Sequence, residues 1–264
     1  MKDVRYLTMN KEEYLYIQTL KENDPKTYDF INNLLKQLRD EVSFTSHEIK
    51  NQLSFLRSSY QLISLKHPET NKFSFWPQLG ASVETLINLM ERTSIYRYSS
   101  TAAFSDTNII QLLYSLPDIM DERFPNETRF FSFDTDIRDI IVDADCERLS
   151  IAFSEILANA YEASQNNDTI YISSNIDEQL QHITIKFINP GTIGIPDEAS
   201  PLIDRYAPLT RQLCTPFYTD KKSHTGLGLA IVNCICCTHN TDFNINCDDH
   251  NTTAEITFPI KYIC

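Results

Sequence analysis

The stretch that decides the fold runs from Tyr28 to Lys66 and reads YDFINNLLKQLRDEVSFTSHEIKNQLSFLRSSYQLISLK. It contains no glycine and no proline, and apolar residues recur in it at every seventh position. These residues are Val42, Ile49, Leu56 and Ile63. A repeat of this kind predicts one long amphipathic helix. At 1.5 Å per residue it would be roughly 58 Å long, which is too long for the interior of a small globule and favours a helical bundle.

A turn follows the predicted long helix. His67-Pro68, Pro77 and Gly80 mark the turn, and a second helical period then leads toward Tyr98. Because two helices cannot enclose both of their apolar stripes, we expect this antiparallel hairpin to pair with a second copy as a dimeric four-helix bundle. The apolar positions of the second helix are Leu79, Val83, Leu86, Ile87 and Met90.

Three regions are expected along the chain. Residues 1–27 predict one short helix that ends near Asp24-Pro25, and the small, polar segment Ser99–Asp106 predicts a linker. We therefore divide the chain into an N-terminal helical segment (1–27), a dimerisation hairpin (28–104) and a second domain (105–264).

Helix and strand patterns alternate in the second domain. The economical architecture is an α/β sandwich in which helices cover one face of a mixed sheet. The predicted fold class is thus α+β multidomain, with a helical hairpin followed by this sandwich. Strands are predicted over residues 129–134, 139–143, 169–175, 182–189, 242–247 and 253–260, and helices over 147–164 and 225–238.

Composition excludes several classes of protein. The 264 residues carry a formal charge of −13 and contain no basic cluster, which argues against a general nucleic-acid binder. No window reaches the about 18 consecutive apolar residues of a membrane span. Charged residues follow Met1 directly, where a signal segment would be apolar. We expect a soluble, cytoplasmic protein with no membrane insertion by this chain.

Seven cysteines, three of them crowded at Cys234, Cys236 and Cys237, do not indicate a disulfide framework. A reducing compartment fits them best. Cys234 and Cys237 form a C-x-x-C pair, which can be half of a metal or redox site, but no second pair lies at zinc-finger spacing. We expect these cysteines to pack a helix as small apolar residues.

Two polar pairs are candidate functional residues. With the seven-residue repeat taken as heptad position a, His47 falls at position f and faces solvent, and Asn51 lies one turn further on the same face. Glu155 and Asn159 are likewise four residues apart on the polar face of the predicted helix 147–164. Carboxylate and amide oxygens at this spacing can hold Mg²⁺, since hard cations prefer oxygen ligands.

The segment Thr225-Gly226-Leu227-Gly228 places two glycines at the start of an apolar helix. A missing Cβ lets the backbone approach a phosphate, and the free N–H groups of a helix N-terminus attract anions. Lys221 and Lys222 supply positive charge just upstream. A lone G-x-G is weak evidence, so this reading depends on the neighbouring motifs.

Taken together, these motifs resemble those of sensor histidine kinases, in the same order and over roughly residues 30–260. SHEIKNQL from Ser46 resembles the H-box, and EILANAYEA from Glu155 resembles the N-box. TPFYT from Thr215, with Lys222, resembles the F-box. GLGL from Gly226 resembles the second glycine box.

The resemblance implies a role for each matching residue. His47 would be the phosphoacceptor, Glu48 the acid/base residue beside it, and Asn51 the residue that orients water in a reverse, phosphatase reaction. Mg²⁺ would be held by Asn159 and Glu155. The ATP-binding residues would be Glu155, Asn159, Asn189, Gly191, Lys222, Gly226, Leu227 and Gly228. The implied function is a homodimeric two-component histidine kinase that phosphorylates His47 from Mg-ATP and passes the phosphoryl group to an Asp of a response regulator receiver domain.

The sequence also departs from the family pattern. Gln52 replaces the usual proline of the H-box, and His224 replaces the leading glycine of the second glycine box. Asn189 replaces the usual Asp of the first glycine box, but keeps a carbonyl that can accept a hydrogen bond from the adenine amino group.

Two alternatives to the kinase therefore stay open. One is an ATP-independent histidine phosphotransferase or docking protein with a degenerate nucleotide site. The other is an ATPase or serine kinase of the same nucleotide fold, because Glu155 matches the general base of chaperone-type ATPases.

Overall fold

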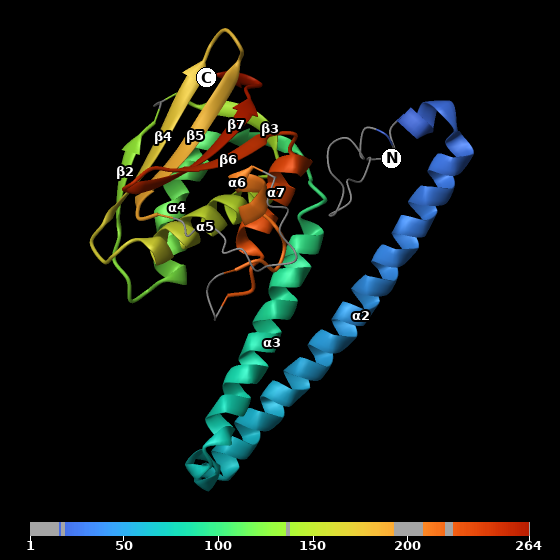
Figure 1. Cartoon of the computed structure of the whole chain (residues 1–264), viewed down its shortest axis with the longest axis vertical. Helices are drawn as coiled ribbons and strands as arrows, with labels where there is room; N and C mark the ends of the chain where they lie inside the picture. The colour runs from blue at the N-terminus through green and yellow to red at the C-terminus, as the bar shows by residue number, and fades with distance from the viewer. Residues whose placement is uncertain (1–15, 17–18, 136–137, 193–207, 220–223, 264) are drawn as a thin grey trace. The chain divides into compact units, whose positions relative to one another are not determined.

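A computed structural model describes residues 16, 19–135, 138–192, 208–219 and 224–263 (Figure 1). The chain divides into two compact units, Met1–Arg97 and Tyr98–Cys264. The first is helical and the second combines helices with strands, as the sequence predicts. The division into residues 1–27, 28–104 and 105–264 stays a prediction. None of the described helices carries an apolar stretch long enough to cross a lipid bilayer.

The first unit is built on one long helix, α2 (Pro25–Lys66). Asp24 fixes its start, because the side chain accepts the backbone N–H of Thr27 at 3.2 Å. Pro25 occupies the first turn, where its missing N–H costs nothing. Residues 19–23 are also helical and end at Asp24, where the N-terminal helix was predicted to end; residues 1–15 and 17–18 lie outside the described part.

The turn is shorter than the sequence predicts. A single 3-10 element, η1 (Pro68–Lys72), leads into α3 (Phe75–Tyr98), so the assignment of Pro77 and Gly80 to the turn is wrong. Pro77 lies in the first turn of α3, where the missing N–H is tolerated. Gly80 lies one turn further, and a Cβ there would come within 2.5 Å of the Tyr60 ring. This glycine therefore leaves room for the Tyr60 ring between the two helices.

One side of α2 contacts α3. The Tyr60 ring stacks on Trp76 at a centroid distance of 4.9 Å, and the Trp76 indole N–H donates to the Ser64 hydroxyl at 2.8 Å. At the other end of the hairpin, Arg97 donates to the Ser46 hydroxyl at 2.8 Å. Ion pairs lie between these contacts, with Arg57–Glu84 at 2.8 Å and Lys50–Glu91 at 4.0 Å.

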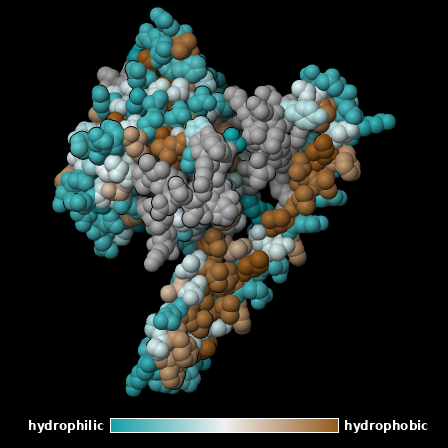
Figure 2. All heavy atoms as spheres, in the orientation of Figure 1, coloured by the Kyte–Doolittle hydropathy of each residue, from teal (hydrophilic) through white to brown (hydrophobic). Residues whose placement is uncertain are grey.

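The side chains of the seven-residue apolar repeat of α2 take no part in those contacts. Its four residues, Val42, Ile49, Leu56 and Ile63, keep between 41% and 51% of their surface exposed. Leu79 and Leu86 of α3 are exposed to a similar extent. Figure 2 shows apolar side chains in a band along both helices. The hairpin by itself therefore leaves an apolar stripe in contact with solvent.

The second unit contains two sheets and four helices among its described residues. A five-stranded sheet has the order β2-β4-β5-β7-β6; β2 pairs with β4 in parallel and the other pairs are antiparallel, so the predicted mixed sheet is confirmed. A three-stranded antiparallel sheet has the order β1-β3-β8. The elements are β1 (Ser105–Asn108), α4 (Ile109–Arg123), β2 (Phe130–Asp134), β3 (Ile140–Ala144), α5 (Cys146–Ala163), β4 (Thr169–Asp177), β5 (His182–Pro190), α6 (Leu209–Leu213), α7 (Gly228–Thr238), β6 (Asp242–Cys247), β7 (Asn251–Pro259) and β8 (Tyr262–Ile263).

The core of this unit lies between the helices and one face of the five-stranded sheet (Figure 1). Phe153 of α5 is fully buried, with its ring 5.3 Å from that of Phe187 and 6.3 Å from that of Phe258. Because side chains alternate along a strand, the opposite face of the same strands carries polar residues such as Lys186 and Glu255, which pair at 3.0 Å.

Each strand and helix predicted for the second domain is present; β6 has the predicted ends, and the other elements differ from the prediction at one or both ends. The linker predicted over Ser99–Asp106 is wrong at its end, since Ser105 and Asp106 belong to β1. The start of this segment is fixed to the domain, because Ser99 is buried and its carbonyl accepts a hydrogen bond from the Thr238 hydroxyl at 2.9 Å. The sequence predicted none of the elements β1, α4, α6 and β8.

The cysteines of α7 have different environments. Cys236 is buried, and burial raises the pKa of its thiol to about 12, so it packs as an apolar residue as predicted. Cys234 is half-buried and Cys237 is exposed, which contradicts the same expectation for Cys237. No cluster of three or more metal-ligating side chains of the His, Cys, Asp or Glu type occurs among the described residues.

Candidate functional site

An exposed histidine stands on α2. His47, Glu48 and Asn51 are all exposed, and Asn51 follows His47 by one helical turn. The preceding residue is held in place: the Ser46 hydroxyl accepts from Arg97 at 2.8 Å and donates to the carbonyl of Val42 at 2.7 Å. The exposure predicted for His47 is confirmed, while its role stays a prediction.

The polar face of α5 carries Glu155 and Asn159, which differ in burial and in their polar contacts. Glu155 is buried, and its Oε1 lies 3.1 Å from Nη1 of Arg123 in an ion pair. Asn159, one turn further, is half-buried. Its Nδ2 is shielded from solvent and has no hydrogen-bond partner in the described part of the chain. A buried amide donor without a partner is costly in a folded protein, so this nitrogen is suited to meet a ligand atom.

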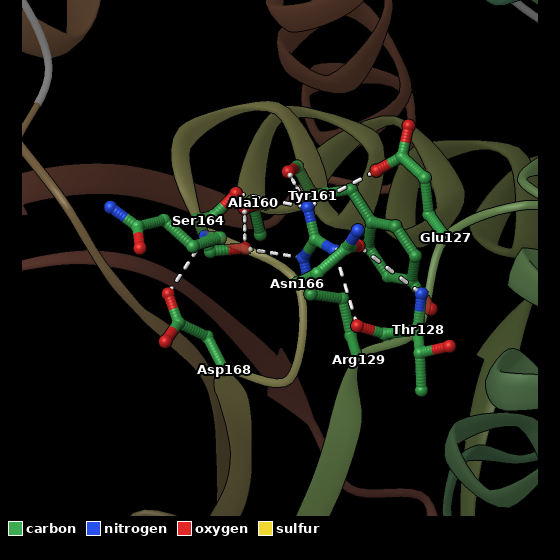
Figure 3. A network of polar contacts seen from close by, with 9 residues as sticks. Glu127, Thr128, Arg129, Ala160, Tyr161, Ser164, Asn166 and Asp168 are labelled. Carbon is green, nitrogen blue, oxygen red and sulfur yellow. Dashed lines mark hydrogen bonds and ion pairs between the residues drawn. The ribbon is translucent and has the colours of Figure 1, made fainter.

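The C-terminal end of α5 is fixed by Arg129 (Figure 3). Its Nη2 donates to the carbonyls of Tyr161 and Ser164, both at 2.9 Å, and its Nε donates to the Ser164 hydroxyl at 3.0 Å. The guanidinium also lies 5.2 Å from the centre of the Tyr161 ring. These bonds satisfy carbonyls that a helix end leaves without partners, and they place a cation at the negative end of the helix dipole.

The first glycine box abuts this helix end. Gly191 has φ +103°, and a Cβ there would come within 2.7 Å of the Ala163 carbonyl oxygen, so only glycine fits without strain. Its N–H donates to the carbonyl of His250 at 2.9 Å. Asn189 is buried and its Nδ2 donates to the Pro190 carbonyl at 2.8 Å, which directs the amide oxygen elsewhere as an acceptor.

The second glycine box meets the F-box. Gly226 has φ +66°, and a Cβ there would come within 2.5 Å of the Phe217 backbone, whose N–H donates to the Gly226 carbonyl at 2.9 Å. Gly228 begins α7, and the buried Leu227 that precedes it provides no side-chain cap. Among the residues that the structure describes, no side chain caps the first N–H groups of α7, and such groups attract an anion.

Helix α5 is the common neighbour of these motifs. It packs along α7, contacts Gly191 through Ala163, and carries Glu162, whose carboxylate lies 3.5 Å from Nδ1 of His224. The residue that departs from the family pattern at the second glycine box thus contacts the N-box helix. The predicted residue Lys222 lies outside the described residues.

The residues present fit a nucleotide, and the Asn159 amide oxygen and the Glu155 carboxylate are oxygen donors of the kind that a magnesium ion prefers. An orphaned amide donor at Asn159, an uncapped helix start at Gly228 and an oriented acceptor at Asn189 are the groups that a phosphate chain and an adenine would use. The sequence indicated these positions. It did not indicate Arg123 or Arg129, because their partners on α5 lie more than thirty positions away in the sequence.

Residues 144–262 match the sequence profile of the family described as histidine kinase-, DNA gyrase B-, and HSP90-like ATPase. Sporulation kinase A of Bacillus subtilis (strain 168) is 24% identical over 82% of this chain and 34% of its own length. Heme sensor protein HssS of Staphylococcus epidermidis is 26% identical over 79% of this chain and 44% of its own length. These likenesses support a sensor histidine kinase core.

The chain spans less than half the length of those curated relatives. Among solved structures, full-length ShkA in complex with AMPPNP aligns with a TM-score of 0.63 at 15% identity, covering 84% of this chain and 46% of that one. At that identity the likeness supports the fold, namely a helical part followed by the α/β domain.

Proposed function

We propose that this chain is an ATP-dependent protein histidine kinase of a two-component system, with His47 as its phosphoacceptor. The observation that carries the proposal is the presence, in one chain, of an exposed His47 on a long helix and of an ATPase-type domain. In that domain the nucleotide motifs gather around α5.

We assign the nucleotide to the α5 surface. Asn159 and Glu155 would hold Mg²⁺, and the backbone at Gly226 and Gly228 would bind the phosphates, with Lys222 as a further positive charge. Asn189 would accept the adenine amino group through its amide oxygen. The bound cation would neutralise charge on the phosphates during transfer.

The phosphoryl transfer would use the exposed face of α2. Glu48 would take a proton from one nitrogen of the His47 imidazole, and the other nitrogen would attack the γ-phosphorus in line. A P–N bond forms, the bond between the γ-phosphorus and the bridging oxygen breaks, and ADP leaves. The phosphoryl group would then pass to an Asp carboxylate of a response regulator receiver domain.

We further propose that the active form is a homodimer. Ile49, Leu56 and the other residues of the seven-residue repeat remain exposed in the single hairpin. Burying them against a second copy in a four-helix bundle would remove that apolar surface from water. A cytoplasmic location belongs to the same proposal.

Incubation with γ-labelled ATP and Mg²⁺ tests the kinase. We expect wild-type protein to incorporate label and His47→Gln to incorporate none, while both bind ADP equally in calorimetry. Nucleotide binding without any label would favour an ATPase. The absence of binding up to millimolar nucleotide would favour the ATP-independent phosphotransferase. The observation that favours this alternative is His224, which replaces the usual glycine of the second glycine box and contacts Glu162.

A further inference from the structure

A buried, ionised carboxylate such as that of Glu155 is unfavourable in free energy unless a cation lies beside it. Glu155 keeps only 6% of its surface exposed, and removing a carboxylate from water without a partner is strongly unfavourable. Arg123 supplies the opposite charge, with its Nη1 3.1 Å from Oε1. This arginine is the last residue of α4, a different helix, so the pair joins two elements of the domain.

Several further contacts fix the position of Arg123. The same Nη1 donates to the backbone carbonyl of Ser154 at 3.3 Å, and the guanidinium lies 5.7 Å from the centre of the Phe124 ring. Phe124 in turn stacks on Tyr161 of α5 at 4.9 Å. A cation at the C-terminal end of α4 is also favoured by the helix dipole. The guanidinium is therefore held where it meets Glu155.

Glu155 and Asn159 lie one helical turn apart, so anything that sets the direction of the Glu155 carboxylate also sets its direction relative to the Asn159 amide. Side chains that ligate a metal depend on such outer partners for their orientation. We infer that Arg123 is a positioning residue of the magnesium-nucleotide site, which it serves by orienting the Glu155 carboxylate beside Asn159. This inference rests on the proposed function, which places Mg²⁺ and ATP at α5.

The proposed role of Arg123 is tested by measuring how strongly Mg²⁺ increases the affinity for ADP. The measure of this effect is the ratio of the Kd measured in EDTA to the Kd measured in excess Mg²⁺, at one pH. A general structural role would weaken both affinities alike and leave the ratio unchanged. Loss of an oriented ligand lowers the ratio, and we expect Arg123→Gln to lower it about tenfold, the usual effect of removing an outer partner.

A double-mutant comparison shows whether Arg123 acts through Glu155. In a Glu155→Gln background we expect Arg123→Gln to cause no further loss of the ratio. Arg123→Lys keeps the charge but lacks the planar fork, and we expect a smaller loss of about threefold. The matched control is Arg138→Gln, which removes an arginine from a surface ion pair with Glu178 and should leave the ratio as in wild type.

The outcomes separate this inference from the proposed function. Wild-type protein that binds ADP no better with Mg²⁺ than without it would overturn the proposed site, and this inference with it. A wild type that shows the Mg²⁺ effect, together with an Arg123→Gln variant that keeps it, would overturn the role of Arg123 alone. An equal loss in both Glu155 backgrounds would also overturn it. If Arg123→Gln does not fold, Arg123→Lys in the two backgrounds decides.

Discussion

The imidazole Nε2 of His239 accepts a hydrogen bond from the backbone N–H of Asp145 at 3.0 Å. The other ring nitrogen, Nδ1, donates to the carbonyl of Ile235 at 2.8 Å, so both nitrogens of this buried, neutral ring are satisfied. Burial lowers the pKa of His239, and the nearby positive charge of Arg148 lowers it as well. The negative charges of Asp145 and Asp143 act in the opposite direction, but burial is the largest effect. The end of α7 and the start of α5 are thereby joined through a group that resists protonation.

A pH dependence of stability follows from His239. Because the pKa of His239 is lower in the folded chain, the unfolded chain takes up a proton on this histidine more readily as the pH falls through about 6.5, and the free energy of unfolding decreases. We expect the urea midpoint of the second unit to decrease between pH 7.5 and 5.5. His239→Gln should be less stable at pH 7.5 but lose less over that range, while His250→Gln, at an exposed position, should follow wild type. An unchanged slope in His239→Gln would contradict this account.

Gly80→Ala should destabilise the hairpin. Alanine normally stabilises a helix interior over glycine by up to about 1 kcal/mol. Here its Cβ would lie 2.5 Å from the Tyr60 ring and push it off Trp76, and overpacking of this kind costs about 1–3 kcal/mol. We expect a net loss of about 1 kcal/mol, with a shift in the emission of Trp76, the single tryptophan. In a Tyr60→Leu background the same change should stabilise; a loss there too would exclude the ring contact as the cause.

A charge in the exposed apolar stripe should prevent dimer formation. Ile49→Glu or Leu56→Glu would place a carboxylate in the proposed seam, where burial without a partner is unfavourable by several kcal/mol. Light scattering at micromolar concentration should give the dimer mass for wild type and the monomer mass for either variant. Gln61→Glu adds the same charge at an exposed position outside the stripe and should remain dimeric. Dimers in all three variants would mean that another surface forms the interface.

Asn51→Ala should separate the two directions of phosphoryl flow. The amide lies one turn from His47 and can orient a water against a regulator's aspartyl phosphate, but it is not needed for attack by the imidazole. We expect dephosphorylation of the regulator to fall at least about tenfold, while labelling of His47 stays near wild type. Ser58→Ala, at the same heptad position one repeat later, should change neither rate. A loss of His47 labelling in Asn51→Ala would place this residue in the kinase step.

The helical hairpin could be predicted because its signal is local. The repeat through Val42 and Ile63 belongs to one uninterrupted helix, and its period survives in α2. Helix α4 was not predicted because Pro117 lies inside it, and proline ordinarily ends a helical pattern. Gly80 was assigned to the turn because glycine ordinarily interrupts a helical pattern. Its place inside α3 is explained by the Tyr60 ring of the other helix, a contact that the local sequence does not show.

The candidate site was predictable residue by residue, but its connections were not. The spacing of Glu155 and Asn159 places both on one face of α5, and a helical period suffices to show this. The ion pair of Glu155 depends on Arg123, which is 32 positions away in the sequence and reaches Glu155 only through tertiary packing. The buried state of Glu155 is therefore a property of the fold, because the sequence pattern describes a polar face and does not show what covers it.

The central claim is that a phosphoryl group from ATP is carried on His47, and identifying the phosphorylated residue tests it most directly. The purified chain is incubated with Mg-ATP at mildly alkaline pH, digested without acid, and its peptides are analysed by mass spectrometry. The account predicts a phosphoryl group on His47 that is stable in alkali, is lost in acid, and is absent from His47→Gln. An acid-stable phosphoryl group on a serine, or undiminished modification in His47→Gln, would contradict it.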